Sequence, residues 1–572
     1  MEKITISCLN DGKDYEIEQG QSLKAISDNI CMTVKDPKTK ATYPVLAAYV
    51  DHKLKELSYS VFYSHNIEFI GYNTLDGKRT YMRSLSFLLE SAVREVFPGM
   101  ILVIDHSLPS GMYCEIVDVK HYTEDGHSVI HIPSCEDISA LKMVMRRKVG
   151  EDIPLIKKKI LAERAEKIFE GNNQVYKSAL QKSLGRYFSS VYYLGDDADS
   201  FHGPLVPSTG YLQTFDLITF GDGFCLQYPS DNDYFKVIPY REQGKMAATL
   251  KDYSNWCRTT GIIGVSTLNK TLLEGGAVKL INLCEARQER NYAAIADKIY
   301  AEKDRIKIVF IAGPSSSGKT SSSLRIAQQC KVLGLVPKVI ELDNYFIDRD
   351  LTPRDEDGNL DFECLEAMDL KLLGENLNDI LAGKTVEIPK YDFKQGKKIW
   401  AGNYINLDEK DILIMEGIHA LDPAMVPDVD QSHIFRVYAS ALTSLNLDEN
   451  NNISTSDNRM LRRMVRDYNY RGHTPENTIL GWPSVRRGEN KYIFPFQENA
   501  DALFNSALLY ELPLLKYYAE PLLRRILPNS PAYSEAVRLL KFLEYIVALQ
   551  PSEIAAIPPT SIMREFIGGQ TL

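Results

Sequence analysis

The sequence predicts a multidomain protein that combines α/β and α+β parts, and three observations support this fold class. The chain has 572 residues, more than a single hydrophobic core usually serves. Its first residues alternate apolar and polar side chains around a turn, as in a β-hairpin. From Ile306 onward, short apolar runs alternate with loops and helical patterns, which predicts a parallel sheet covered by helices.

The N-terminal region is expected to form a small β-rich module. Ile4, Ile6 and Cys8 alternate with polar residues up to the turn Asn10-Asp11-Gly12, after which the alternation resumes. Two further strand-like runs, YPVLAAYV and IEFIGY, follow. We therefore expect this module to span residues 1–72.

The rest of the chain divides into four expected parts. A second part over 73–235 contains a helix from Tyr81, the strand-like runs ILVID and GMYCEI, and a helix over IPLIKKKILAERAEKIFEGNN with its Gly-Asn-Asn stop. A connector with a helix, LINLCEARQERNYAAIADKIYAEKD, occupies 236–302. The α/β domain spans 303–510, with IKIVFIA, KVIEL and DILIM as parallel strands covered on both faces, and a Leu-rich helical extension spans 511–572.

The stretch GPSSSGKT lies between the apolar run IKIVFIA and a helical segment. This is the pattern of a loop whose backbone N–H groups and following helix N-terminus bind phosphate. Lys319 would reach the outer phosphates and Thr320 would ligate Mg²⁺. A serine-rich turn that matches by chance is the alternative, and the preceding strand argues against it. The expected nucleotide-binding residues are Gly313, Pro314, Ser315, Ser316, Ser317, Gly318, Lys319, Thr320 and Ser321.

Two acidic residues follow neighbouring predicted strands. Asp343 comes after KVIEL, and Glu416 comes after DILIM. In an open α/β sheet the ligand lies at the carboxyl ends of the strands, so both are placed near the phosphate loop. Asp343 suits the deprotonation of an acceptor hydroxyl and Glu416 suits Mg²⁺ binding. Asp343 has an alternative role as a turn or helix cap. Glu416 has the alternative of no metal contact, because the metal-binding residue at this position of such folds is often Asp.

The segment DNRMLRRMVRDYNYRG carries a row of arginines at helical spacing. Arg459, Arg462, Arg463 and Arg466 share one face, and Arg471 follows. Guanidinium groups neutralise the charge that develops during phosphoryl transfer. Such a row is also typical of a solvated helix face, and the phosphate loop nearby in sequence favours the phosphate role.

These motifs occur in an order that resembles the uridine kinase branch of the P-loop nucleoside kinase and phosphoribulokinase family. The shared motifs are GPSSSGKT, LDNYF, YDF, IMEGIHAL and RMLRRMVRDYNYRG. The resemblance implies an ATP-dependent kinase that phosphorylates the 5′-hydroxyl of a nucleoside such as uridine or cytidine, with ATP and Mg²⁺ as cofactors. The implied catalytic residues are Asp343, Lys319, Arg459 and Arg462. The implied substrate-binding residues are Asp343, Tyr345, Asp361, Tyr391, Arg459, Arg463 and Arg466. The implied metal ligands are Thr320 and Glu416.

The match departs from the nucleoside kinases at the base-reading position. In those kinases YDF is followed by a histidine that reads the pyrimidine and by an arginine. Here YDFKQGKK places Gly396 and Lys398 at those positions. A sugar phosphate or another small metabolite therefore stands beside a nucleoside as the expected acceptor.

The N-terminal half resembles parts of threonyl-tRNA synthetases. Residues 1–72 resemble their small β-grasp TGS domain, and YMRSLSFLLESAV, VFPGMILVIDHSLPSGMYCEI and GPLVPSTGYLQTF resemble their second additional domain. In the synthetases an HxxxH pair and a later cysteine and histidine act in editing. Arg83, Phe87, Phe201 and Leu205 stand here instead, and none is a zinc ligand. The open roles are RNA contact, regulation or a scaffold, and an ATP-switched RNA-binding protein is the alternative for the whole chain.

Composition narrows the class of protein and its compartment. A net charge of -10 argues against a nucleic-acid-coating surface, although tRNA or RNA contact by the N-terminal half stays open. The nine cysteines show no CxxC pair, as expected for reduced thiols. The start lacks the apolar core of a signal peptide, and no apolar run approaches a membrane span. We expect a cytoplasmic protein with no membrane partner, and the kinase resemblance suggests a homo-oligomer.

Overall fold

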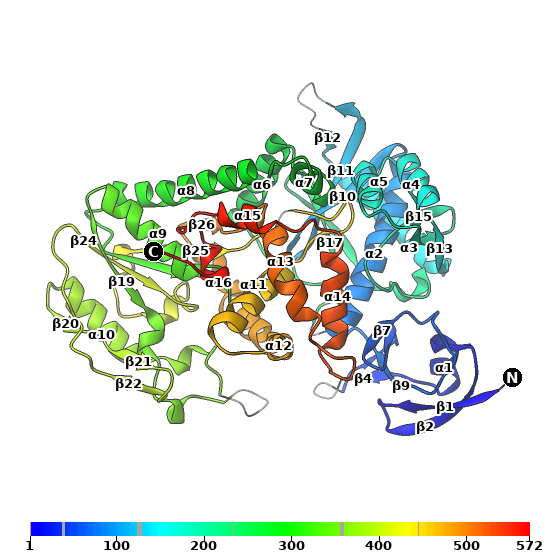
Figure 1. Cartoon of the computed structure of the whole chain (residues 1–572), viewed down its shortest axis with the longest axis horizontal. Coiled ribbons are helices and arrows are strands. Elements are labelled where there is room, and N and C mark those ends of the chain that lie inside the picture. Colours follow the sequence, from blue (N-terminus) through cyan, green and yellow to red (C-terminus); the bar gives the residue numbers. More distant parts are fainter. Residues whose placement is uncertain are drawn as a thin grey trace.

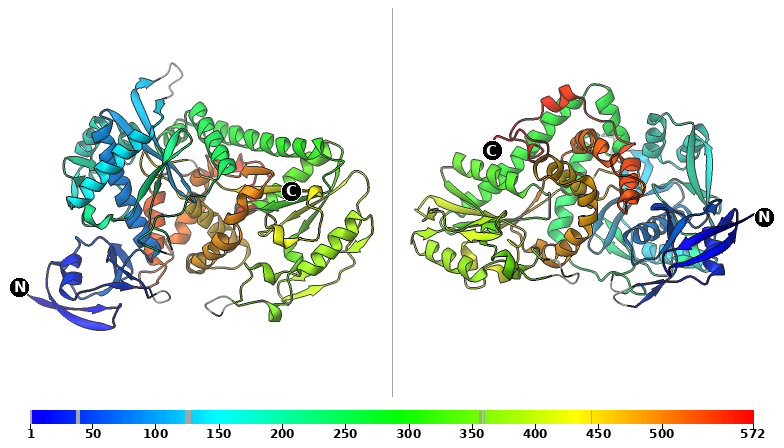
Figure 2. Two further views of the ribbon diagram at one scale, coloured as in Figure 1. Left: turned by 180° about the vertical axis from the view of Figure 1, so that it is seen from behind. Right: turned by 60° about the horizontal axis from the view of Figure 1, so that its bottom comes forward.

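The computed structural model describes residues 2–36, 40–122, 128–231, 233–354, 358, 360–443 and 445–572. Figure 1 shows an N-terminal half built on small sheets and a C-terminal half built on one parallel sheet. The reverse and tilted views in Figure 2 agree that helices α13 (Glu511–Leu523) and α14 (Tyr533–Leu543) lie between the two halves. The C-terminal extension is therefore a central part of the fold.

The N-terminal module is a five-stranded sheet in the order β2-β1-β9-β6-β7. The predicted hairpin is confirmed, since β1 and β2 pair antiparallel from Lys3 opposite Glu18 to Cys8 opposite Lys13. Helix α1 buries Leu23 and Ile26 in the core of this module. The bounds are β1 Lys3–Cys8, β2 Lys13–Glu18, α1 Leu23–Asn29, β6 Ala47–Val50, β7 Lys53–Lys55 and β9 Asn66–Ile70.

The second part packs a long helix, α2 (Leu75–Val96), beside a five-stranded antiparallel sheet. Its order is β10-β11-β17-β16, and β12 (Ser128–His131) pairs with β11 outside this path. One hydrophobic cluster runs from the first module into this part, and the rings of Tyr72, Tyr81 and Tyr234 meet in it. The two expected N-terminal domains thus share a core across residue 72. The bounds are β10 Met100–Leu108, β11 Gly111–Tyr122, β16 Asp216–Phe220, β17 Gly223–Gln227 and, on the outer side, α3 Cys135–Gly150.

The segment IPLIKKKILAERAEKIFEGNN was expected to be one helix, and this expectation is wrong for its first part. It forms strand β13 (Leu155–Leu161) and then helix α4 (Ala162–Gly171). Strand β13 pairs antiparallel along its whole length with β14 (Phe188–Leu194). The ammonium groups of three lysines lie over aromatic rings of β14, an attraction that the helical pattern does not reveal: Lys157 over Tyr192, Lys158 over Tyr193 and Lys159 over Phe188.

The C-terminal half contains the predicted parallel sheet, in the order β19-β24-β18-β25-β26 with every pairing parallel. All residues of β18 and β24 are buried. Strand β19 lies at the sheet edge and exposes Val336 and Val339, so full coverage holds only for the central strands. The bounds are β18 Ile308–Ala312, β19 Val336–Glu341, β24 Asp411–Glu416, β25 Ile434–Ser440 and β26 Ala502–Asn505.

Helices from the connector and the extension enclose this half. Helix α8 (Ala277–Ala301) packs with α9 (Lys319–Val332) against one face of the sheet. The arginine segment forms helix α11 (Thr455–Tyr470), followed by α12 (Pro475–Tyr492). A second cluster joins the apolar side of α11 to α13, α14 and the connector helix α7 (Val265–Leu273).

The loop between β25 and α11 is buried in the N-terminal half. Its Glu449 carboxylate accepts the backbone N–H of Lys177 at 3.1 Å, and Asn450 Nδ2 donates to Asp199 at 2.9 Å. The Lys177 ammonium pairs with Asp199 and lies 3.6 Å from Asp448 Oδ1. These two carboxylates raise the pKa of Lys177, against the effect of its burial. A buried ionic network therefore joins the two halves.

All nine cysteines are unpaired, as the spacing predicted. Two of them, Cys31 and Cys135, are exposed. Within the described residues, no helix is both long enough and apolar enough to cross a membrane.

We predict that Lys177→Met destabilises the fold by about 3–5 kcal/mol, because it leaves Asp199 and Asp448 buried without their counter-charge. Thermal unfolding of the full chain measures this. Lys182→Met on the same helix, α5 (Val175–Ser183), is the matched control, since it removes an exposed ion pair with Glu170 that water screens. Equal shifts of the melting temperature in both variants would contradict a joining role for Lys177.

Candidate functional site

The loop between β18 and α9 has the backbone of an anion-binding turn. A Cβ on Gly313 would lie 2.0 Å from the carbonyl oxygen of Ala439, so only glycine fits there. Ser316 and Gly318 have positive φ angles of 58° and 84°, which turn the loop before α9 begins at Lys319. The buried Oγ atoms of Ser316 and Ser317 have no hydrogen-bond partner among the described residues. Hydroxyls left unpaired in such a turn are suited to a phosphate.

The strand ends bring the predicted chemical groups together. Thr320 Oγ1, at the start of α9, donates to Glu416 Oε1 at the end of β24 at 2.7 Å. Asp343 lies directly after β19, in the one-turn helix Leu342–Tyr345. Burial raises the pKa of Glu416 to about 7 and raises that of Asp343, while the positive charge of Lys319 lowers both. Lysine, threonine and two carboxylates therefore share one electrostatic environment at the sheet edge.

Arg459 lies behind the phosphate loop. It is 1% exposed, and its Nη1 donates to the carbonyl of Ser315 at 3.0 Å. Its guanidinium pairs with Glu489 of α12, through Nη2 at 2.8 Å. The Glu489 carboxylate also accepts the backbone N–H of Ser315 at 3.0 Å. The Arg459–Glu489 pair thus binds both backbone polar groups of Ser315, on the two peptide units that flank its Cα.

Arg462 supports the next part of the loop. It is fully buried, pairs with Glu511 at the start of α13, and donates to the carbonyl of Ser316 at 3.5 Å. It also donates to the carbonyl of Ser506 at 2.9 Å, and Ser506 Oγ donates to the carbonyl of Ser317 at 2.6 Å. The structure therefore differs from the expected catalytic role of Arg459 and Arg462. Both contact loop carbonyls and are neutralised by buried carboxylates, so they position the loop.

The remaining arginines lie closer to solvent. Arg463 Nη1 donates to Ser315 Oγ at 2.8 Å. The guanidiniums of Arg463, Arg466 and Arg471 converge on Asp467, at 3.2, 2.9 and 3.7 Å. Three positive charges against one carboxylate leave a net positive surface beside the loop. This group is the better candidate for contact with phosphate.

The residues expected to bind the phosphate acceptor differ in their burial and in their hydrogen-bond partners. Tyr345 is buried, and its hydroxyl accepts a hydrogen bond from Asn376 at 3.1 Å, so it serves the core instead of a substrate. Tyr391 is 3% exposed, and its hydroxyl has no partner among the described residues. Its ring contacts Phe346 at 5.7 Å between centroids. Asp361 accepts the backbone N–H of the residue two positions on, which is a turn contact. Among the three residues just described, Tyr391 offers a buried hydroxyl with no partner in the described part of the chain.

The base-reading position carries other contacts. The side chain of Arg349 lies against Gly396, with Nε 2.7 Å from the position that a Cβ would take. The ammonium of Lys398 pairs with Asp369, and its backbone N–H donates to Asp348 at 3.0 Å. Burial of Tyr391 raises the pKa of its hydroxyl, and the charge of Arg349 lowers it. A guanidinium therefore lies against Gly396.

Two acidic residues of the site, Glu363 and Glu489, were not found from the sequence. Burial, together with the charge of Glu489, raises the pKa of Glu363 to about 7, and the charges of Arg463 and Lys319 lower it. Glu363 follows Asp361 in GNLDFE, a position with no motif of its own. Glu489 belongs to α12, where only its place on the buried face gives a signal. Both positions depend on tertiary packing.

We predict that Glu363→Gln stabilises the protein at pH 8 relative to the parent, and has little effect at pH 4. The carboxyl ionises near pH 4.5 when unfolded and near pH 7 when folded, so the parent loses unfolding free energy as pH rises from 4.5 to 7. Thermal melting across this range measures the difference. The nearby Glu375→Gln changes an exposed carboxyl on α10 (Leu370–Leu381) and serves as the control. An unchanged pH profile in Glu363→Gln would contradict the raised pKa.

The four residues expected at positions that resemble the editing site of the synthetases meet in a packed cluster. Arg83 donates from Nε to the carbonyl of Pro204 at 3.2 Å, and the rings of Phe87 and Phe201 lie 5.3 Å apart. Leu205 is buried in the same core. In the described ranges, no group of three or more His, Cys, Asp or Glu side chains is placed to hold a metal ion.

Comparison with known proteins finds similarity to two kinds of enzyme. Residues 308–509 match the model of the Phosphoribulokinase / Uridine kinase family. The uridine kinase of Macrococcus caseolyticus is 33% identical over 197 residues, which are 34% of this chain and 86% of that protein. The threonine–tRNA ligase of Clostridium kluyveri is 26% identical over 217 residues, which are 38% of this chain and 31% of that protein.

A solved structure, described as that of a possible uridine kinase from Bacillus stearothermophilus, aligns with 38% of this chain and 99% of its own. Its identity to this chain is 18%, and the TM-score is 0.26. The kinase relatives therefore cover about a third of the chain, and the similarity to the tRNA ligase extends over about a third of that enzyme.

Proposed function

The chain belongs to the phosphoribulokinase and uridine kinase family, and we therefore propose that it transfers the γ-phosphate of ATP to the 5′-hydroxyl of a nucleoside such as uridine or cytidine. The observation that supports this most directly is the meeting of the phosphate loop with Asp343 and Glu416 at three neighbouring strand ends. A phosphoryl transfer site needs a phosphate cradle, a metal-binding oxygen and a carboxylate for the acceptor hydroxyl. This edge of the sheet offers all three.

Each group has a defined task in the proposed reaction. The loop amides and Lys319 bind and orient the outer phosphates. Thr320 and Glu416 supply the oxygen ligands that Mg²⁺ prefers, and the ion neutralises charge on the phosphates when bound. Asp343 accepts the proton of the attacking hydroxyl; its raised pKa brings it closer to neutral pH, where a base is most effective. Arg463 stabilises the charge that develops on the transferred phosphoryl group.

A sugar phosphate is the second candidate acceptor, and Arg349 is the observation that favours it. Its guanidinium lies against Gly396, near the free hydroxyl of Tyr391, at the position where a nucleoside kinase reads the base. A guanidinium binds a phosphate through paired hydrogen bonds. The acceptor assay therefore includes both chemical classes.

The decisive experiment is ADP release from Mg-ATP across a panel of nucleosides and sugar phosphates. We predict that one acceptor stimulates turnover and that Asp343→Asn and Lys319→Ala each lower kcat at least about 100-fold, because the first removes the base and the second a phosphate charge. Lys331→Ala, in the last turn of α9, is the matched control and should retain the parent rate. Undiminished turnover in both site variants would sink the proposal, and stimulation by sugar phosphates alone would reassign the acceptor.

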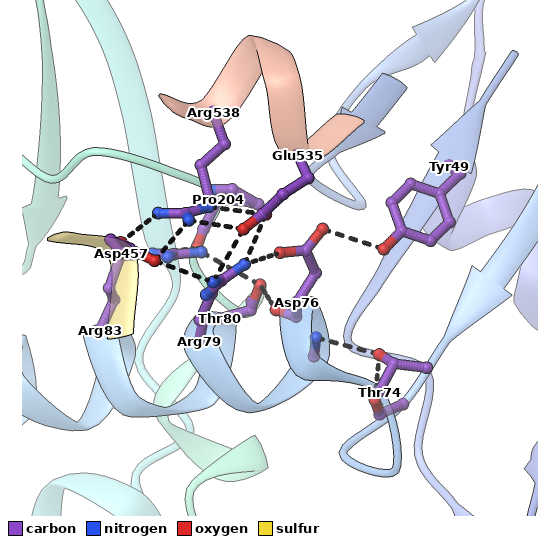
Figure 3. A network of polar contacts seen from close by, with 12 residues as sticks. Tyr49, Thr74, Asp76, Arg79, Thr80, Arg83, Pro204, Asp457, Glu535 and Arg538 are labelled. Carbon is purple, nitrogen blue, oxygen red and sulfur yellow. Dashed lines mark hydrogen bonds and ion pairs between the residues drawn. The ribbon is translucent and has the colours of Figure 1, made fainter. Parts of the chain in front are cut away.

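We further propose that the synthetase-like N-terminal half acts as a scaffold for the arginine helix. Figure 3 shows Arg79 of α2 between carboxylates from three separate regions. Its guanidinium lies 3.1 Å from Asp76, 2.8 Å from Glu535 of α14 and 3.5 Å from Asp457 in the first turn of α11. Arg538 of α14 donates to Asp457 at 2.7 Å. The start of α11 is thus held from the N-terminal half and from the C-terminal extension together.

This scaffold role predicts a kinetic effect at a distance. Arg79→Met should lower kcat/KM for ATP about 2- to 30-fold, the usual range for coupling through a packed network, because α11 carries the arginines that hold the loop. Arg147→Met, which removes an exposed ion pair with Glu95 in the same half, is the control. Steady-state kinetics at a temperature well below unfolding separates this from instability. Unchanged kinetics together with salt-sensitive tRNA binding would instead favour an RNA role for this half.

A further inference from the structure

The last residues of the chain lie on the phosphate loop. We call residues 561–570 the C-terminal strap; it contains the short helix α16 (Arg564–Ile567). Figure 1 shows the C-terminus beside α9, within the kinase half. Ile562, Met563 and Phe566 are at most 1% exposed, so the strap is packed into the protein. From the sequence, SIMREFIGG offered a docking strap back onto the kinase domain, and ordinary helix packing was the favoured interpretation.

The strap contacts a group that the proposed nucleotide needs. Glu565 Oε2 accepts the hydroxyl of Ser321 at 2.6 Å and lies 3.4 Å from its backbone N. Gln570 Nε2 donates to the same hydroxyl at 2.8 Å. Ser321 is the third residue of α9, so its N–H has no acceptor within the helix and points toward the anion site. A carboxylate of the chain itself therefore occupies a position suited to phosphate.

Two more strap residues cover the same loop. Ile562 Cδ1 lies 2.2 Å from the position that a Cβ on Gly318 would take. Gly318 has a φ of 84°, so a side chain here would meet both backbone strain and the strap. The ring of Phe566 lies 5.2 Å from the guanidinium carbon of Arg462. The strap thus contacts the loop, the start of α9 and the helix that supports the loop.

The strap is anchored at its beginning and contains two consecutive glycines near its end. Ser561 Oγ donates to Glu285 of α8 at 2.7 Å and lies 3.2 Å from the hydroxyl of Tyr510. After the buried Phe566, the chain continues through Gly568 and Gly569, both with positive φ. Two consecutive glycines permit a change of chain direction at little steric cost. Glu565 precedes these glycines and adjoins the buried Phe566, so withdrawal of its carboxylate has to release Phe566 as well, while Ser561 stays anchored.

We propose that the C-terminal strap is an autoinhibitory element in which Glu565 competes with a nucleotide phosphate for the N–H and hydroxyl of Ser321. The inference rests on the proposed function, since it assumes that the loop binds a nucleotide. The Glu565 carboxylate and a phosphate cannot both accept from the N–H and hydroxyl of Ser321. Their negative charges would also repel each other if both lay within hydrogen-bonding distance of Ser321. Nucleotide binding requires the carboxylate to withdraw, so the apparent affinity is reduced by the fraction of molecules in which the strap is closed.

The first test measures the affinity of the full chain for Mg-ATP by titration calorimetry. Glu565→Gln keeps the shape of the side chain but removes its charge. We expect it to bind Mg-ATP about 10-fold more tightly than the parent, because it weakens the charge-assisted contact that the nucleotide has to displace. Glu544→Gln is the matched control, because it changes an equally charged but exposed residue that pairs with Arg186. Its affinity should equal that of the parent.

The outcomes separate this inference from the proposed function. Binding to the parent with no gain in Glu565→Gln would overturn the strap and leave the kinase proposal intact. Absence of Mg-ATP binding in every variant would overturn the nucleotide site itself, and the strap with it. If the double variant Glu565→Gln/Lys319→Ala loses the Mg-ATP affinity that Glu565→Gln gains, the competition takes place at the loop.

Hydrogen exchange gives a second readout that needs no substitution. If nucleotide displaces the strap, backbone amides of residues 564–570 should exchange faster in the presence of saturating Mg-ATP than in its absence. Exchange that is equally slow in both states would show that the strap stays closed over a bound nucleotide, and would overturn the proposal.

Discussion

The buried pair between Arg459 and Glu489 is the interaction on which the site depends. Two opposite charges held away from water cost free energy unless further hydrogen bonds satisfy them. Here Arg459 donates to the carbonyl oxygen of Ser315, and Glu489 accepts from its backbone N–H. The pair therefore fixes the conformation of a loop that has positive φ angles and unpaired hydroxyls. A loop with such a backbone does not keep its shape unless its surroundings determine it. The preorganisation of the phosphate site is thus supplied from α11 and α12.

The position of α11 in turn depends on segments far away in the sequence. Asp457, in its first turn, meets Arg79 from the N-terminal half and Arg538 from the extension. The loop before α11 is buried among charged groups of the N-terminal half. The apolar side of α11 itself packs on the extension. This explains why the kinase-like segment shares clusters with both flanking regions. The flanking regions stabilise the helix that positions the loop, so they belong to the energetics of the site.

How much of this the sequence predicts depends on whether a feature is local. The hairpin, the phosphate loop and the acidic residues after the strands were predicted, because turn chemistry and strand order fix them within a short segment. The LIKKKIL strand was missed because its pairing with a distant strand outweighs a helical pattern. The inward burial of Arg459 and Arg462 was missed because their partners, Glu489 and Glu511, lie 30 and 49 positions away. Glu363 and the strap show the same limit, since only packing brings them to the loop.

The contacts of the loop differ in kind between its two sides. Behind it, Arg459 and Arg462 contact carbonyl groups, which a nucleotide does not use, so these contacts persist when phosphate binds. In front of it, Glu565 contacts an N–H and a hydroxyl, which phosphate does use. A ligand that enters the site therefore competes only with the front contact and keeps the support behind. The front contact comes from the C-terminal strap, and the rear contacts come from α11, which is linked to the N-terminal half. Withdrawal of the strap and preorganisation of the loop are therefore set by different regions. A change in one region can then alter nucleotide affinity without altering the shape of the loop.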